Sequence, residues 1–136
     1  MPWVASVHVL VVHFPIGLLV TATLIDLVRL WRGRDLVVTR LWGTIGVIGA
    51  WVACVTGAWN RHWQLTRGLL TGTPAAIVVN WHVALSVAAT FMWTLALILK
   101  YRRPSSLTTR WMCGLEVSGL GLLLATAHLG GIVAHG

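Results

Sequence analysis

Six histidines are the residues of this sequence whose type and setting best suggest chemistry. A neutral imidazole can ligate a haem iron, copper or zinc, and it can also exchange protons near neutral pH. The six residues are His8, His13, His62, His82, His128 and His135. Most lie within or beside long apolar runs, where a polar and titratable side chain is energetically expensive and therefore suggests a function.

Four apolar runs must position these histidines. The chain has 136 residues, of which 57% are hydrophobic and 10% are charged. The runs cover about 3–31, 39–60, 75–101 and 108–133, and each is long enough for a membrane-spanning helix. We therefore predict an all-α fold, an integral membrane four-helix up-down bundle, with residues 1–136 as a single domain. The first run is too long for a signal peptide and is expected to be retained as a span.

The net charge of +7 reflects membrane topology rather than nucleic-acid binding. Eight of the ten basic residues flank the first and third connections, and only Arg61 and Arg67 lie in the middle one. Because basic residues favour the cytoplasmic side, both termini and the middle connection are expected on the periplasmic side. The expected location is the bacterial inner (cytoplasmic) membrane, as a multi-pass protein.

This topology places all six histidines in the outer half of the bundle. His13, His82 and His128 form a deeper tier, contributed by spans one, three and four. His8, His62 and His135 form a shallower tier. His8 and His13 are five residues apart, so the helical repeat directs them about 140° apart. They are therefore not expected to meet at one point.

The interpretation that fits this cluster best is b-type haem, one or two per chain. Two imidazoles from facing helices can ligate the iron axially, while apolar walls hold the macrocycle. Spans one and three are commonly diagonal in an up-down bundle, so His13 and His82 are the expected axial pair. His128 would be a third ligand or half of a second pair. Arg61 or Arg67 could pair with haem propionates at the outer surface.

Two other interpretations remain open. Three histidines (His13, His82 and His128) could instead hold copper or zinc, since imidazole suits both metals. The histidines could also be hydrogen-bonded interhelical contacts in a cofactor-free accessory subunit of a membrane complex. Covalent c-type haem attachment is excluded, because the sequence has no Cys-x-x-Cys-His motif.

The acids are few and lie away from the histidines. Asp26 is followed three residues later by Arg29, a natural helical partner. Glu116 lies about two turns into span four, and we expect it to pair with Arg110 or Arg40, or to be protonated. A proton or quinone role for Glu116 is a further hypothesis. Because no acid shares the depth of the histidines, a catalytic triad is not indicated. We expect an electron carrier or complex subunit rather than a stand-alone enzyme.

Two short motifs resemble those of an uncharacterised bacterial family of small four-helix membrane proteins. The first motif is His13-Phe14-Pro15 with Asp26 downstream. The second is a Gly-Gly…His-Gly close, here Gly130-Gly131-Ile-Val-Ala-His135-Gly136, one residue shorter than the family pattern. Some members of that family are associated with redox domains such as Rieske proteins. The resemblance therefore implies an electron-transfer setting. The partners expected are membrane lipid, other protein subunits or a periplasmic redox partner, with quinone as a further candidate and no nucleic acid.

Overall fold

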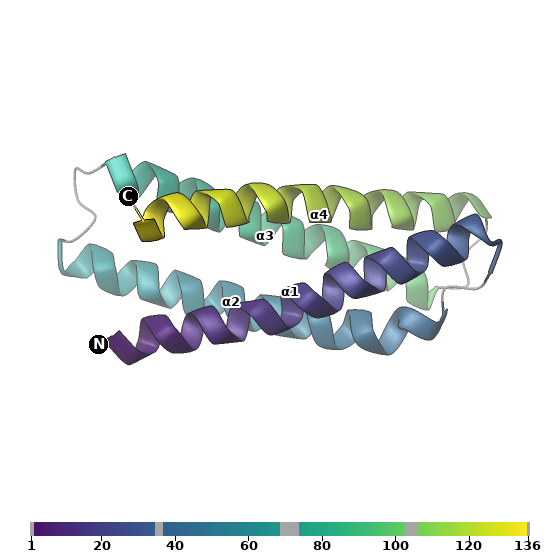
Figure 1. The fold of residues 1–136 in the computed structure, drawn as a ribbon, viewed down its shortest axis with the longest axis horizontal. Helices are drawn as coiled ribbons and strands as arrows, with labels where there is room; N and C mark the ends of the chain where they lie inside the picture. Colours follow the sequence, from purple (N-terminus) through teal and green to yellow (C-terminus); the bar gives the residue numbers. More distant parts are fainter. Residues whose placement is uncertain (1, 35–36, 69–73, 103–105, 136) are drawn as a thin grey trace.

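The computed structural model describes residues 2–34, 37–68, 74–102 and 106–135 as a bundle of long helices (Figure 1). Side chains are described for a smaller set of residues. These are 11–34, 38–68, 76–102 and 107–131.

The helices are α1 (Pro2–Trp31), α2 (Arg40–Thr66), α3 (Pro74–Tyr101) and α4 (Ser106–His135), with a short 3-10 helix, η1 (Val37–Thr39), before α2. Each long helix contains a segment that is long and apolar enough to cross a membrane. The predicted all-α, four-helix membrane fold is therefore confirmed.

One boundary differs clearly from the prediction. We expected the second span to end near residue 60, but α2 continues to Thr66. The added turns contain no glycine or proline, so nothing in the sequence breaks the helix there. Gly68 follows with φ +70°, a left-handed conformation that glycine adopts without steric cost.

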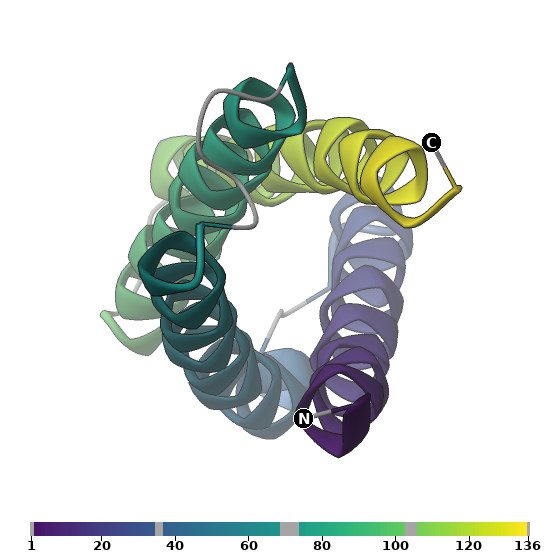
Figure 2. The same cartoon turned by 90° about the vertical axis from the view of Figure 1, so that its left-hand side faces the viewer.

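The helices form a ring in chain order, with α1 packed on α2, α2 on α3, α3 on α4 and α4 on α1 (Figure 2). Helices α1 and α3 are therefore diagonal, as predicted. The start of α1, the end of α2, the start of α3 and the end of α4 lie at one end of the bundle, here called the terminal end (Figure 1). Helix η1, the end of α3 and the start of α4 lie at the opposite end. The α1–α2 pair and the α3–α4 pair lie further apart at the terminal end than at the opposite end (Figure 1).

The packed core fills the middle of the bundle. Leu19, Val47, Ala89 and Trp93 form one buried cluster from three helices. The Trp93 indole donates a buried hydrogen bond to the Thr23 hydroxyl at 3.2 Å, which ties α3 to α1. A second buried cluster lies nearer the opposite end and joins α3 to α4 through Ala96, Met112 and Cys113.

Small residues allow these close approaches. A Cβ on Gly46 would lie 2.8 Å from the Leu19 side chain, so any larger residue would force Leu19 or the helices to shift. Pro15 lies inside α1 without ending the helix and packs on Gly49, where an added Cβ would lie 3.0 Å from the proline ring. Part of the small-residue pattern of α2 therefore serves helix packing.

Candidate functional site

The halves of the helices towards the terminal end line an apolar cavity of about 670 Å³. All four long helices contribute to its wall, and most of the lining side chains are apolar. Leu19 and Trp93 of the core belong to the lining and separate the cavity from the rest of the bundle. This size lies within the range of roughly 300–1,000 Å³ that is typical of small-molecule and cofactor sites.

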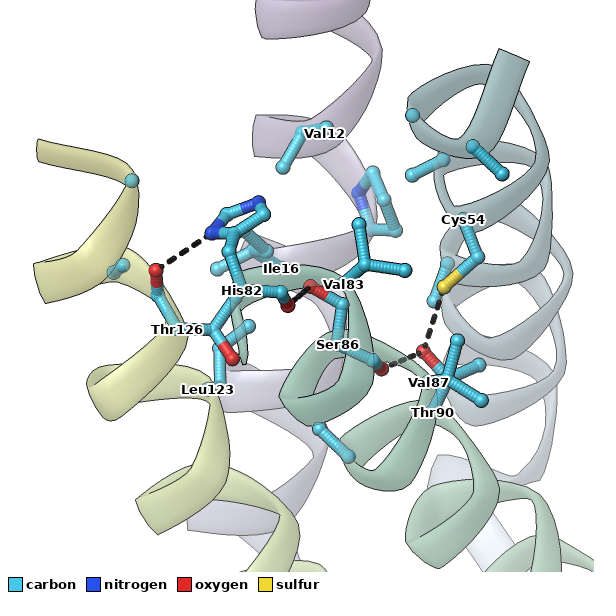
Figure 3. Close-up of a pocket in the computed structure, with 18 of the residues that line it drawn as sticks. Val12, Ile16, Cys54, His82, Val83, Ser86, Val87, Thr90, Leu123 and Thr126 are labelled. Atoms are coloured by element: carbon cyan, nitrogen blue, oxygen red, sulfur yellow. Dashed lines mark hydrogen bonds between the residues drawn. The ribbon is translucent and has the colours of Figure 1, made fainter. Parts of the chain in front are cut away.

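His82 is the best-defined polar group of this cavity (Figure 3). Its Nδ1 lies 2.9 Å from the backbone carbonyl oxygen of Thr126 on the neighbouring helix α4. Because a carbonyl oxygen only accepts, Nδ1 donates and carries the ring proton. In the neutral imidazole, Nε2 is then the unprotonated nitrogen, which is the form that ligates a metal ion.

Gly130 makes room for this imidazole. A Cβ at position 130 would lie 3.1 Å from His82 Cε1 and 3.4 Å from Nδ1. Any other residue there would press on the ring and on its hydrogen bond to Thr126. The sequence motif Gly130-Gly131 therefore has a structural role at the cavity, since both glycines line its wall.

A ladder of hydroxyl groups continues from His82 along the same face of α3. The Ser86 hydroxyl donates to the His82 carbonyl at 2.7 Å, and the Thr90 hydroxyl donates to the Ser86 carbonyl at 2.8 Å. The Thr90 hydroxyl also lies 3.5 Å from the Cys54 sulfur of α2 (Figure 3). These hydroxyls bond within their own helix, so the polar groups below His82 are satisfied without a ligand.

His13 lines the same cavity from α1, the helix diagonal to α3. Two of the predicted ligands, His13 and His82, therefore share one cavity. Ala53 and Gly57 of α2 also line it, so the small residues of α2 leave space here as well as packing against α1.

Arg61 places a cation in the cavity wall. Its Nε and Nη2 both donate to the Asn80 side-chain oxygen, at 2.9 and 2.5 Å, which holds the guanidinium between α2 and α3. Arg67 is placed differently. It is exposed, and its guanidinium carbon lies 4.3 Å from the centre of the Trp63 ring, away from the cavity lining. Of the two arginines predicted to face an anionic group, only Arg61 contributes to this site.

Of the other four histidines, the structure describes the side chains of two. His62 and His128 are exposed and do not belong to its lining. His8 and His135 lie in α1 and α4, but their side chains are outside the described residues. Within the described part of the chain, no three His, Cys, Asp or Glu side chains come together as a metal site. The three-histidine copper or zinc site therefore gains no support.

A second polar site, at the opposite end, was missed by the sequence reasoning. Lys100 of α3 forms ion pairs with Asp26 of α1 and Glu116 of α4, and all three side chains are buried. We expected Arg29 beside Asp26, and Arg110 or Arg40 beside Glu116. The signal that could have revealed this ion cluster is that Lys100 is the only lysine of the chain and ends the third span at the depth of both acids.

Comparisons with known proteins give a family but no function. The sequence profile of a family described as a predicted membrane protein, DUF2231, matches residues 5–136. A search of the curated proteins and a search of the solved structures found no match. The match covers almost the whole chain and includes both end motifs, so this four-helix membrane protein belongs to the DUF2231 family.

Proposed function

We propose that this protein binds b-type haem in the cavity at the terminal end and acts as a membrane electron-transfer protein. The observation on which the proposal rests is His82. Its Nδ1–H is fixed on the Thr126 carbonyl, so that Nε2 is left as the metal-binding nitrogen beside an apolar cavity. Haem-ligating and metal-ligating histidines are commonly oriented by such a hydrogen bond to the second ring nitrogen.

The residues around His82 suit a flat, apolar group with an anionic edge. The cavity wall is apolar, and the glycines of α2 and α4 leave space along it. His13 offers a second imidazole from the diagonal helix, so both histidines would be available to hold the haem iron. Bound haem would supply a one-electron couple between ferric and ferrous iron. The chain's own residues would orient it, exclude water from it and set its potential through burial and ligand identity.

Arg61 is suited to the anionic edge. Asp26 and Glu116, the two acidic residues that the structure describes, fall outside the cavity lining, so no carboxylate among the described residues lies there. Asn80 is a neutral partner and leaves the positive charge uncompensated. A carboxylate such as a haem propionate would complete this arrangement through charge-assisted hydrogen bonds.

We further propose that the terminal end faces the periplasm of the bacterial inner membrane. The support is the excess of arginine and lysine around the connections at the opposite end. Electrons would then be exchanged near the outer surface, with a periplasmic redox carrier, a quinol or another subunit of a larger complex.

The experiment that tests the ligands is substitution of single histidines in the full-length purified protein. His82→Ala and His13→Ala are each expected to abolish or strongly shift the haem absorption spectrum. His62→Ala and His128→Ala are matched controls, since both side chains are exposed and outside the cavity lining. Unchanged spectra in both His82→Ala and His13→Ala would overturn the axial assignment.

A further inference from the structure

The ion cluster at the opposite end joins three helices through buried charged groups. Lys100 Nζ donates to a carboxylate oxygen of Asp26 and, at 2.9 Å, to Oε1 of Glu116. The Thr39 hydroxyl, just before α2, donates to the other Asp26 oxygen at 2.5 Å. The exposed fractions of Asp26, Lys100 and Glu116 are 0%, 2% and 3%. Water therefore contributes little to stabilising these charges.

The charges within this cluster do not balance when all three groups are ionised. One ammonium faces two carboxylates, which leaves one net negative charge in a buried site. Burying an uncompensated charge costs several kcal/mol, so buried ionic groups are normally paired or neutralised. The imbalance calls for one more positive charge, and a proton is the simplest.

Within the described part of the chain, Asp26 and Glu116 both form their ion pairs with Lys100. On α1, Arg29 lies one turn beyond Asp26, is half-buried and has an interaction of its own. Tyr101, the residue after Lys100, is the last residue of α3. The Arg40 guanidinium lies over the Tyr101 ring, with 5.4 Å between the guanidinium carbon and the ring centre. On α4, Arg110 is exposed. Among the described residues of α4, the Cys113 thiol is also buried, and it carries no positive charge.

The two carboxylates differ in their hydrogen bonds. Both oxygens of Asp26 accept hydrogen bonds, one from the Thr39 hydroxyl and the other from the Lys100 ammonium. Glu116 accepts from Lys100 through Oε1, whereas its Oε2 is buried with no hydrogen-bond partner among the described residues. The unpartnered oxygen is therefore where a proton can be added without breaking an existing contact.

We propose that the Asp26–Lys100–Glu116 cluster is a proton-binding site, in which Glu116 Oε2 holds one proton that balances the cluster. The site lies at the end of the bundle away from the cavity and does not depend on what the cavity holds. It gives the chain a buried group that can take up and release one proton between the helices. A result for or against haem binding therefore does not decide whether Glu116 holds a proton.

The sequence makes a direct test unusually selective, because Glu116 is the only glutamate and Lys100 the only lysine of the chain. Protein grown with side-chain ¹³C-carboxyl glutamate therefore reports on one carboxyl group in the wild-type protein. In lipid-reconstituted full-length protein at neutral pH, we expect the chemical shift and infrared carbonyl band of a protonated carboxylic acid. A signal of an ionised carboxylate at neutral pH would overturn the proposal.

A variant provides a second, independent test. Asp26→Asn removes one negative charge while preserving the shape of the side chain. Lys100 and Glu116 then balance each other, so the labelled Glu116 is expected to change to the ionised form at the same pH. If Glu116 remains protonated in folded Asp26→Asn protein, charge balance does not control the proton and the proposal fails.

Discussion

The imidazole of His82 lies so close to the backbone of Gly130 that a Cβ at position 130 would displace the ring. An added Cβ would lie 3.1 Å from His82 Cε1. The contact positions the ring so that its Nδ1 reaches the Thr126 carbonyl. The glycine of one end motif thereby determines the geometry of the proposed ligand on another helix.

Replacing Gly130 is therefore expected to disturb the haem site. Gly130→Ala should move the His82 ring by a few tenths of an ångström and alter the haem spectrum, and Gly130→Val should weaken or abolish haem binding. Visible absorption and haem content measure both effects. Gly121→Ala is the matched control on α4, because an added Cβ there meets nothing within 4 Å. If Gly121→Ala and Gly130→Ala changed the haem spectrum equally, the change would come from α4 as a whole. The predicted contact between Gly130 and His82 would then be contradicted.

Arg61 and Arg67 form a second matched pair. We expect Arg61→Gln to weaken haem binding by roughly ten- to a hundredfold, because it removes a charge-assisted hydrogen bond worth about 1.5–3 kcal/mol. Arg67→Gln should leave the affinity unchanged, since Arg67 stacks on Trp63 outside the cavity lining. Haem titration of the apoprotein measures the two affinities. An equal loss in both variants would indicate general electrostatic attraction rather than a contact of Arg61.

Lys100 is expected to be the most sensitive charged residue for stability. Lys100→Met leaves Asp26 and Glu116 buried without their cation, and breaking a buried ion pair in this way costs about 3–5 kcal/mol. Unfolding in mixed detergent micelles with increasing denaturing detergent measures the change. Arg102→Gln is the control, because Arg102 is exposed two residues further on. Similar unfolding midpoints for wild-type protein and Lys100→Met would contradict a stabilising ion cluster.

The orientation in the membrane can be checked separately. We expect a periplasmic reporter enzyme to be active when fused to either terminus and inactive when inserted at residue 34 or 102. The reason is that most arginine and lysine residues flank the connections at the opposite end. A cytoplasmic fluorescent reporter should give the reverse pattern. Activity of the periplasmic reporter at residue 34 would invert the proposed topology.

The fold could be predicted from the sequence because its signals are local. Apolar runs of spanning length, interrupted by charged or glycine- and proline-containing segments, define the four helices. The extension of α2 to Thr66 was missed because Arg61 and His62 suggested a connection. In a membrane protein, polar residues mark the interface, and a helix can continue beyond it.

The sites could be predicted only in part, since they depend on how helices face each other. His13 and His82 were found because a histidine in an apolar run stands out. Both histidines line one cavity, and they reach it from the diagonal helices α1 and α3. The exposure of His128 depends on the rotation of α4, which a small-residue pattern on several faces does not define. The partners of Asp26 were missed because Lys100 was counted only as a topology signal.

The visible absorption spectrum of the full-length protein, purified in mild detergent from haem-replete cells, tests the central proposal most directly. We predict a Soret band and, on reduction, the α-band of a b-type haem, with one or two haems per chain by haem extraction. Protein that folds as a helical bundle but carries no haem, and takes none up when haem is added, would contradict haem binding in the His13–His82 cavity.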